Sequence, residues 1–218
     1  GCMVTTGIVG ASMPIACGMA LASSVRNDKR VTIANFGDGA SNIGAFHESM
    51  NLAAVWQLPV IFVCQNNRFA EHTTMEKATA VKQVAERGKA YNMPSVTIDG
   101  NDPIAVYHAA AEAIERARGG GGPTLIEAMT FRFNGHLVGD PGSYIPKAQM
   151  AKAKEEDPYP KYRQWIVDYG YASDEEVQAI DDDITREVDD AETFAMESDW
   201  PGPEELTIDV FASTGGRA

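Results

Sequence analysis

The sequence has few cysteines, few basic residues and no long apolar run. Its three cysteines, Cys2, Cys17 and Cys64, show no CxxC spacing, which predicts free thiols and a reducing, cytoplasmic compartment. Lys and Arg number 18 against 31 Asp and Glu. Because phosphate-rich partners need a basic surface, we expect neither nucleic acid nor an anionic membrane as a partner. No apolar stretch reaches the roughly 20 residues of a membrane-spanning helix.

The fingerprint of dinucleotide-binding proteins is also missing. That fingerprint is GxGxxG between a strand and a helix, whereas residues 10–18 read GASMPIACG with no strand pattern before them. A hydride-transferring enzyme of the Rossmann type is therefore disfavoured. There is no internal repeat, and the only low-complexity run is the four glycines at 119–122.

What the chain does contain is an alternation of strand and helix patterns. Apolar, mostly β-branched runs predict buried strands, and segments with helical spacing lie between them. This order predicts an α/β fold in which helices flank a parallel sheet. We expect strands at 31–36, 60–64, 96–98 and 124–130, and helices at 10–25, 43–57, 81–91 and 103–118, the last capped by Asp102.

The composition changes after Phe131. Residues 134–146 are rich in Gly, Asp, Pro and Ser and predict a long loop, and helices are expected at 158–169 and 173–197. Ser173 and Glu176 have the spacing of a capping box for the last, very acidic helix. We therefore expect an α/β domain at 1–146, including the loop, and a helical C-terminal extension at 147–218.

Polar residues follow two of the predicted strands. Gly37-Asp38-Gly39 ends one strand, and Asn66-Asn67 ends the next. Ligands of open parallel sheets bind outside the carboxyl ends of the strands, and paired glycines allow the backbone to approach an anion closely. A carboxylate and an amide oxygen at this edge suit Mg²⁺ or Ca²⁺. Simple Asp-Gly and Asn-Asn turns are the alternative.

These motifs carry a resemblance to a known family. GDG, a crossover helix and then NN resembles the thiamin diphosphate fingerprint, and the string GDGASNIGAFHESMNLAAVWQLPVIFVCQNNRFAEHT is similar to the alpha subunit of the E1 component of 2-oxo acid dehydrogenases. This group includes the pyruvate, branched-chain and acetoin dehydrogenase systems. GIVGASMPIACGMALA at 7–22 and FNGHLVGDPGSY at 133–144 agree with it, so the resemblance spans nearly the whole chain and implies the thiamin diphosphate-binding fold.

The resemblance implies a role for each matching position. Asp38 and Asn67 would give side-chain oxygens to Mg²⁺, and Phe69 its backbone carbonyl. The backbone of Gly37, Gly39 and Ala40 would contact the diphosphate of thiamin diphosphate. The backbone of Gly7 and Val9 would contact its aminopyrimidine ring.

Histidine 136 is the candidate catalytic residue. A lone His in a loop is usually a surface residue, but His136 stands beside Gly135 and before the glycine-rich 139–142 segment. The resemblance places it near the diphosphate, where it could act as an acid or base. His72, after the NNRFAE turn, and Arg132, which could pair with an acid of the loop, are weaker candidates.

The activity implied is oxidative decarboxylation of a 2-oxo acid such as pyruvate, with transfer of the acyl unit to a lipoyl group on an E2 partner. Two alternatives stay open: an acetoin-cleaving E1 alpha subunit, and a non-catalytic interaction subunit that keeps the fold. An E1 beta subunit is expected as partner, because the family's activating glutamate belongs to it.

The sequence departs from the family at two places. The family's upstream segment, with a Tyr-Arg pair that contacts the diphosphate, has no counterpart here, so we expect a separate chain or segment to supply it. The position after the loop histidine is a regulated serine in mammalian members, whereas here it is Leu137, so phosphorylation there is excluded. Ser143 matches a second such position.

Overall fold

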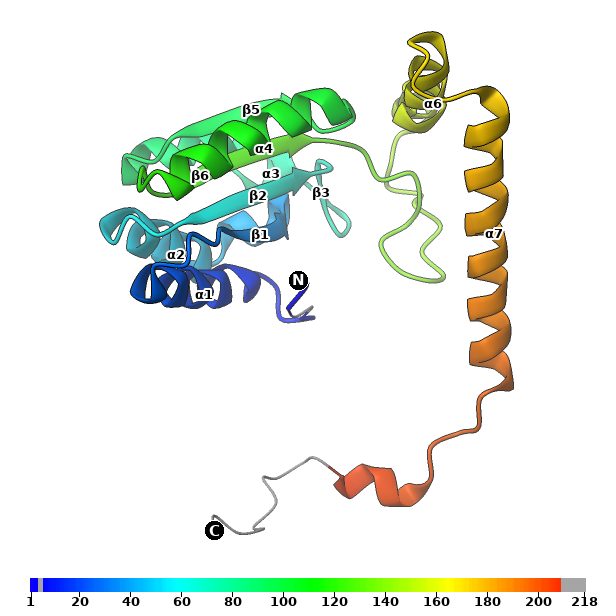
Figure 1. Ribbon diagram of the computed structural model, residues 1–218, viewed down its shortest axis with the longest axis horizontal. Coiled ribbons are helices and arrows are strands. Elements are labelled where there is room, and N and C mark those ends of the chain that lie inside the picture. The colour runs from blue at the N-terminus through cyan, green and yellow to red at the C-terminus, as the bar shows by residue number, and fades with distance from the viewer. Residues whose placement is uncertain (4–5, 209–218) are drawn as a thin grey trace. The chain divides into compact units, whose positions relative to one another are not determined.

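The computed structural model describes residues 1–3 and 6–208. Its centre is a four-stranded sheet with the order β1-β2-β6-β5. Every pair is parallel: β1 (Thr32–Gly37) with β2 (Val60–Asn66), β2 with β6 (Thr124–Met129), and β6 with β5 (Ser95–Asp99). All four strands therefore end at the same edge (Figure 1).

Helices cover both faces of this sheet, as the strand-helix alternation predicted. Figure 1 shows α1 (Ser12–Arg26) and α2 (Gly44–Val55) on one face and α4 (Pro103–Arg118) on the other. The larger core, on the α1 and α2 face, contains Phe46 and Phe62, and the smaller core, on the α4 face, contains Ile61 and Ile126. Neighbouring residues of β2 and β6 enter opposite cores, because side chains alternate along a strand.

The predicted strands and long helices are present with small shifts at their ends. Asp102 caps α4 as expected, since its Oδ1 accepts hydrogen bonds from the N–H groups of Ile104 (2.9 Å) and Ala105 (3.2 Å). Strand β2 is buried over most of its length, which its continuous apolar run predicted.

One predicted helix differs in type, and one short helix was not predicted. The helix expected at 81–91 is instead the 3₁₀ helix η2 (Val84–Tyr91), which begins at a capping box of Gln83 and Glu86. The chain after Gly37 first forms the 3₁₀ helix η1 (Asp38–Asn42), and α2 begins only at Gly44. The tighter turn leaves Ile43 extended between the two helices.

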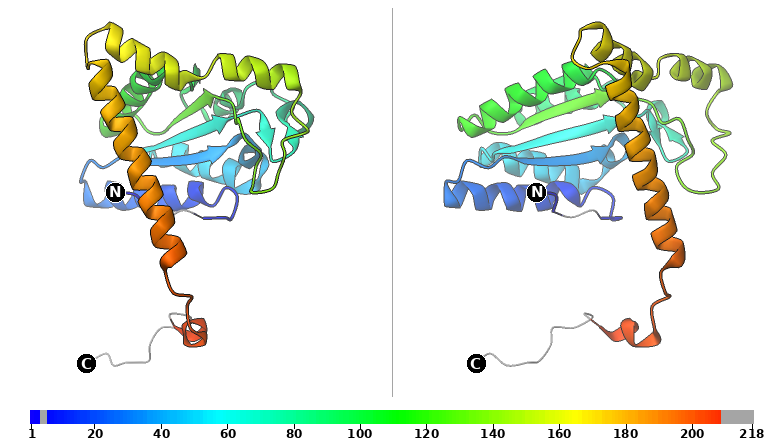
Figure 2. Two further views of the ribbon diagram at one scale, coloured as in Figure 1. Left: turned by 90° about the vertical axis from the view of Figure 1, so that its right-hand side faces the viewer. Right: turned by 45° about the vertical axis from the view of Figure 1, so that its right-hand side comes forward.

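The segment after β2 forms small elements that the sequence patterns did not predict. A two-stranded antiparallel hairpin pairs β3 (Phe69–Ala70) with β4 (Thr73–Thr74), and the four-residue helix α3 (Met75–Ala78) follows. The hairpin contacts η1 and lies beyond the carboxyl end of β2 (Figure 2). Residues 131–146 form no helix or strand, as predicted for the loop.

The contacts within the chain divide it into residues 1–161 and 162–218. The predicted boundary after residue 146 falls inside the first unit, just before α5 (Lys147–Glu155). Helix α6 (Pro158–Asp168) crosses the division, and α7 (Asp174–Glu197) and the 3₁₀ helix η3 (Pro203–Thr207) belong to the second unit.

Helix α7 begins with the predicted capping box. The Ser173 hydroxyl accepts from the N–H of Glu176 at 3.2 Å, and the Glu176 carboxylate accepts from the N–H of Ser173 at 2.8 Å. Arg163 of α6 pairs with Asp174 at 2.6 Å and so joins the two helices. Within the described ranges, no helix combines the length and the apolar character needed to cross a bilayer.

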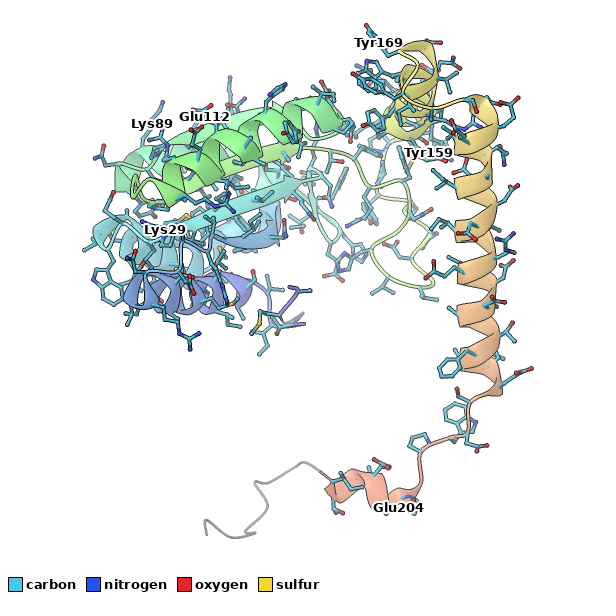
Figure 3. All side chains as sticks on the ribbon, viewed as in Figure 1. Lys29, Lys89, Glu112, Tyr159, Tyr169 and Glu204 are labelled. Carbon is cyan, nitrogen blue, oxygen red and sulfur yellow. The ribbon has the colours of Figure 1, made fainter. Side chains whose placement is uncertain are left out.

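Charged side chains populate the outside of the first unit. Figure 3 labels Lys29, Lys89 and Glu112, and all three are exposed. Asp38, which directly follows β1, and Glu127 of β6 are buried carboxylates, and both lie near the carboxyl edge of the sheet.

Candidate functional site at the carboxyl edge of the sheet

Asp38 is the first residue after β1, and its side chain is buried, with 3% of the residue exposed. No Lys, Arg or His forms an ion pair with it anywhere in the described ranges. Ser41 fixes the turn that presents it, because the Ser41 hydroxyl donates to the Asp38 carbonyl at 2.7 Å. A buried carboxylate without a paired cation is costly unless another positive group compensates for it.

The electrostatics of Asp38 reflect this position. Burial raises the pKa of the Asp38 carboxyl above its ordinary value. Hydrogen bonds from backbone N–H groups, its own and that of Asn67, together with the positive field of Arg132, act in the opposite direction, while the negative charge of Glu127 adds to the rise. The structure thus brings the backbone of Asn67 to the carboxylate of Asp38.

The turn after β2 is held by its own asparagines. Asn66 is fully buried, and its Oδ1 accepts from the N–H of Arg68 at 2.9 Å. Asn67 is half-buried, and its Oδ1 accepts from the N–H of Phe69 at 3.0 Å. Arg68, between Asn67 and Phe69, has a φ of 70°. The Asn-Asn pair therefore does form a turn, and the turn carries Asn67 and Phe69 to the sheet edge where Asp38 lies.

Gly39 is required by a close approach between η1 and the hairpin. A Cβ placed on Gly39 would lie 2.6 Å from the Cβ of Ala70, which real side chains do not reach. At Gly37 a Cβ would meet no described atom within 4 Å, so the end of β1 borders open space. Ala40 is buried in the larger core. Of these three residues, which were predicted to contact the diphosphate, Gly37 and Gly39 have no side chain of their own to cover their backbone.

The predicted aminopyrimidine contacts lie in an exposed turn before α1. Gly7 is exposed, and 65% of Val9 is exposed. Gly10, with a φ of 80°, packs so closely on Ile43 that a Cβ there would overlap the Ile43 side chain. The turn therefore lies against the residue that follows η1, on the side of the sheet covered by α1 and α2. Residues 4 and 5, just before it, lie outside the described ranges.

The 131–146 loop packs on the hairpin through aromatic rings and Arg132. Tyr144 contacts Phe69 and His72, with ring centroids 5.7 and 4.8 Å apart. The Arg132 guanidinium donates to the Tyr144 hydroxyl at 2.6 Å and to the carbonyl of Glu71 at 2.9 Å. The loop that carries His136 is thus tied to the segment that carries Phe69.

His136 itself is exposed and is oriented by two neighbours. Its backbone N–H donates to Asp140 at 2.7 Å, and the Arg132 guanidinium lies 3.2 Å from its Nδ1. Because a guanidinium can only donate, Nδ1 is the acceptor and the ring hydrogen belongs on Nε2. His136 therefore offers an N–H group from an exposed position, and it lines a hollow of about 560 Å³ together with Met150 and other residues of 133–138 and 140–142.

Asp140 makes several of the hydrogen bonds that hold the loop. Its carboxylate accepts hydrogen bonds from the N–H of Gly142 at 2.9 Å, the N–H of His136 at 2.7 Å and the hydroxyl of Tyr144 at 2.9 Å, and His72 lies 3.5 Å away. These bonds, the Gly142 one first, lower the pKa of Asp140 to about 2. Burial and the bond to Asp140 raise the pKa of Tyr144.

Several residues of this edge were missed by sequence reasoning. Asp140, Tyr144 and Glu127 were not among the candidates, although a single Glu in the strand TLIEAM was a visible signal, because a charge in a buried strand needs a specific partner. His72, a weaker candidate, contacts Asp140 and Tyr144 of the loop. The pairing expected for Arg132 is indirect, because Tyr144 stands between Arg132 and Asp140.

The donor set at the edge suits a hard divalent cation better than a transition metal. No group of three or more His, Cys, Asp or Glu side chains with metal-binding geometry occurs in the part of the chain that the structure describes. A buried carboxylate without an ion pair, at the same sheet edge as an asparagine amide and the backbone carbonyls of a turn, is instead the oxygen-only chemistry of Mg²⁺ or Ca²⁺. The residues present fit such an ion.

The arrangement is that of an α/β protein whose ligand edge is formed by the carboxyl ends of parallel strands. Residues 1–204 match the family model described as "Dehydrogenase E1 component". The chain belongs to this family, and the family as a whole implies thiamin diphosphate dependence.

Curated relatives agree with this assignment. The chain is 44% identical to the alpha subunit of acetoin:2,6-dichlorophenolindophenol oxidoreductase of Bacillus subtilis, over 98% of this chain and 64% of the relative. It is 38% identical to the pyruvate dehydrogenase E1 component subunit alpha of Rhizobium meliloti, over 94% of this chain and 59% of the relative. It is 40% identical to the 2-oxoisovalerate dehydrogenase subunit alpha of Bacillus subtilis, over 94% of this chain and 62% of the relative. The predicted resemblance to E1 alpha subunits is confirmed.

Proposed function

We propose that this chain forms the metal- and diphosphate-anchoring part of the thiamin diphosphate site in a 2-oxo acid dehydrogenase E1 alpha subunit. The chain spans less than two thirds of the length of the curated relatives described above. The activity, the substrate and the partners of the whole protein are therefore part of the proposal. The observation that carries it is the buried Asp38 carboxylate, which meets the Asn67 backbone at the ends of two adjacent strands.

In this proposal the anchoring residues take the roles that the family resemblance implies. Asp38 and Asn67 supply side-chain oxygens to Mg²⁺, and Phe69 supplies its carbonyl. Gly37, Gly39 and Ala40 present backbone to the diphosphate, and at Gly37 no described atom would meet a Cβ within 4 Å. Gly7 and Val9 offer backbone groups to the aminopyrimidine. When bound, thiamin diphosphate supplies the electron sink for the loss of CO₂ from a 2-oxo acid.

His136 acts as a hydrogen-bond donor at the mouth of the site in this proposal. Arg132 holds its Nδ1, so Nε2–H is the group that faces a bound anion or a reacting oxygen. Asp140 and Tyr144 keep the loop in this conformation through their hydrogen bonds. The Nε2–H group can then donate a hydrogen bond to negative charge that develops on a reacting oxygen, without movement of the loop.

The partners follow from the same proposal. An E1 beta subunit would complete the site with the residue that activates the aminopyrimidine, and the part of the relatives that this chain does not match would add further cofactor contacts. A lipoyl-bearing E2 would accept the acyl group. A reducing, cytoplasmic compartment is supported by the three cysteines, all of which are free.

Acetoin is the second substrate candidate. The two relatives named for acetoin, from Bacillus subtilis and Cupriavidus necator, are 44% and 42% identical to this chain. The relatives named for pyruvate and 2-oxoisovalerate are 38% and 40% identical. Turnover of acetoin, pyruvate and 2-oxoisovalerate by the protein assembled with its beta subunit, with dichlorophenolindophenol as electron acceptor, separates these substrates.

The anchor is tested by replacing Asp38. In the protein assembled with its beta subunit, Asp38→Asn removes the negative charge and is expected to weaken Mg²⁺-dependent binding of thiamin diphosphate by at least about 100-fold. The binding is measured by isothermal titration calorimetry and the fold by circular dichroism. Asp99→Asn is the matched control, because Asp99 ends β5 and its side chain accepts from the N–H of Asn101, a bond that an Asn oxygen can keep.

Three results decide the proposal. Loss of binding in Asp38→Asn with binding unchanged in Asp99→Asn supports the anchor. Tight binding by Asp38→Asn rejects the assignment of Asp38. A wild-type protein that does not bind thiamin diphosphate at all favours the non-catalytic interaction subunit instead.

A further inference from the structure

Glu127 is a buried carboxylate that none of the proposed cofactor contacts uses. It lies on β6, between β2 and β5 in the sheet, and 0% of the residue is exposed. Its neighbours in sequence, Ile126 and Ala128, are apolar, and its partner in register on β2 is Cys64. A charge in this position has no access to water, so its hydrogen bonds decide what it does.

One carboxylate oxygen of Glu127 is committed to Asn66. The Asn66 side-chain nitrogen, Nδ2, donates to Oε1 of Glu127 at 2.6 Å and lies 3.0 Å from the sulfur of Met75. This fixes which way the Asn66 amide faces. Its oxygen must then point to the N–H of Arg68, the contact observed at 2.9 Å. Glu127 therefore selects the orientation in which Asn66 closes the turn.

The other oxygen holds Glu127 in place. Oε2 accepts from the N–H of Ala85 at 3.0 Å and from the hydroxyl of Thr97 at 3.1 Å. Ala85 belongs to η2 and Thr97 to β5. Each oxygen faces a donor that cannot accept, the Asn66 NH₂ on one side and the Ala85 N–H on the other, so both oxygens are acceptors. The side chain thus spans from β5 and η2, on one side, to the end of β2, on the other.

The turn that Glu127 controls carries two of the proposed metal ligands. Two successive backbone N–H groups donate to side chains in this turn: that of Arg68 to Asn66 Oδ1, and that of Phe69 to Asn67 Oδ1. Arg68 is held at a positive φ between them. If the bond between Asn66 and Arg68 is lost, the turn is no longer held at residue 68. The bond between Asn67 and Phe69 and the direction of the Phe69 carbonyl are then free to change.

We propose that Glu127 is a positioning residue for the divalent-cation site, acting through Asn66 on the turn that presents Asn67 and Phe69. The proposal rests on the proposed function, since it concerns the ion held at that edge. It assigns no contact with the ion to Glu127 itself. The proposal requires that the side chain at position 127 can only accept hydrogen bonds, because this sets the orientation of the Asn66 amide.

Glu127→Gln tests this requirement with little change of shape. Glutamine brings an NH₂ group that must face either the Asn66 amide nitrogen or the Ala85 N–H, and both are donors. If the new NH₂ faces Asn66, that amide flips and the N–H of Arg68 loses its acceptor. Thr97→Val is the matched control, because it removes a bond to the same carboxylate but leaves Asn66 untouched.

The first measurement is Mg²⁺ affinity. Titration of Mg²⁺ in the presence of thiamin diphosphate, on the protein assembled with its beta subunit, is expected to show about tenfold weaker binding for Glu127→Gln, the scale of losses from groups behind metal ligands. Thr97→Val is expected to keep wild-type affinity even though it lowers the melting temperature. Where Glu127→Gln does not fold, Glu127→Asp takes its place, since the shorter side chain cannot reach both sets of donors.

The second measurement needs no cofactor. Hydrogen exchange of the Arg68 and Phe69 amides is expected to be faster in Glu127→Gln than in the wild type, and unchanged in Thr97→Val. Wild-type Mg²⁺ affinity in Glu127→Gln, or an equal loss in Thr97→Val, overturns the positioning role while leaving the anchor intact. A wild-type protein that binds no Mg²⁺ under these conditions rejects the anchor itself, and with it this role.

Discussion

At the scale of single residues, the candidate site contains two kinds of carboxylate. Asp38 and Glu127 are buried in the domain, whereas Asp140 belongs to a loop and is surrounded by donors. Burial dominates at Asp38 and raises its pKa, while hydrogen bonds dominate at Asp140 and lower its pKa. The same functional group is therefore tuned in opposite directions by its surroundings.

The lowered pKa of Asp140 predicts how the loop responds to acid. A carboxyl whose pKa falls on folding stabilises the folded loop above its ordinary pKa of 3.8, and this stabilisation is lost as the pH falls toward about 2. In an NMR titration from about pH 6 to about pH 3, the amide resonances of His136 and Gly142 are expected to stay in place.

A variant and a contrary result complete this test. Asp140→Asn loses an acceptor and gains a donor, so both resonances should differ from the wild type at every pH. Asp102→Asn, in the cap of α4, is the control that should leave them unchanged. A titration midpoint near 4 for the wild-type amides would contradict the loop network.

At the scale of elements, the site depends on how closely η1 approaches the hairpin. Three short segments, the turn at 7–10, η1 and the 66–70 turn with its hairpin, meet at the end of the sheet, and each uses a residue that tolerates little change. Gly10 packs on Ile43 and Gly39 on Ala70. Close packing of small elements thus decides whether the backbone groups of the site lie together.

Gly39→Ala is expected to destabilise the protein by about 1–3 kcal/mol, because the new Cβ would force η1 and β3 apart. Adding Ala70→Gly removes the opposing methyl group and should restore part of this loss. Gly18→Ala is the control: it lies in α1, meets no described atom within 4 Å, and should be neutral or stabilising. Thermal or urea unfolding measures all four proteins.

A double variant no more stable than Gly39→Ala would show that the Ala70 contact is not the cause of the destabilisation. In that case the strain would have to arise within η1 itself.

At the scale of the whole molecule, charge is the main physical constraint. The formal net charge is -13, and α7 carries acidic residues along most of its length. Such a surface repels phosphate-rich polymers and anionic bilayers. The proposed partners are proteins and a small cofactor whose anionic end is reached through a metal ion, which is consistent with this charge.

The expected outcome is that the protein binds neither duplex DNA nor vesicles with anionic lipid at about 0.15 M salt, where surface charges more than about 8 Å apart are screened. Gel mobility shift and vesicle co-sedimentation are the measurements, with a basic protein of similar size as the positive control. Micromolar affinity for either would show that a local basic surface outweighs the net charge.

The sequence by itself determined the α/β class, the order of strands and long helices, both capped helix starts at Asp102 and Ser173, and the family. It could do so because apolar periodicity, capping residues and the GDG and NN motifs act over a few neighbouring residues. Only the tertiary structure decided which side chains meet. Glu127 is 61 positions from Asn66, and Asp140 is 68 from His72, so no local pattern could reveal these pairs. They form because parallel strands bring their ends to one edge and the loop folds back onto the hairpin there.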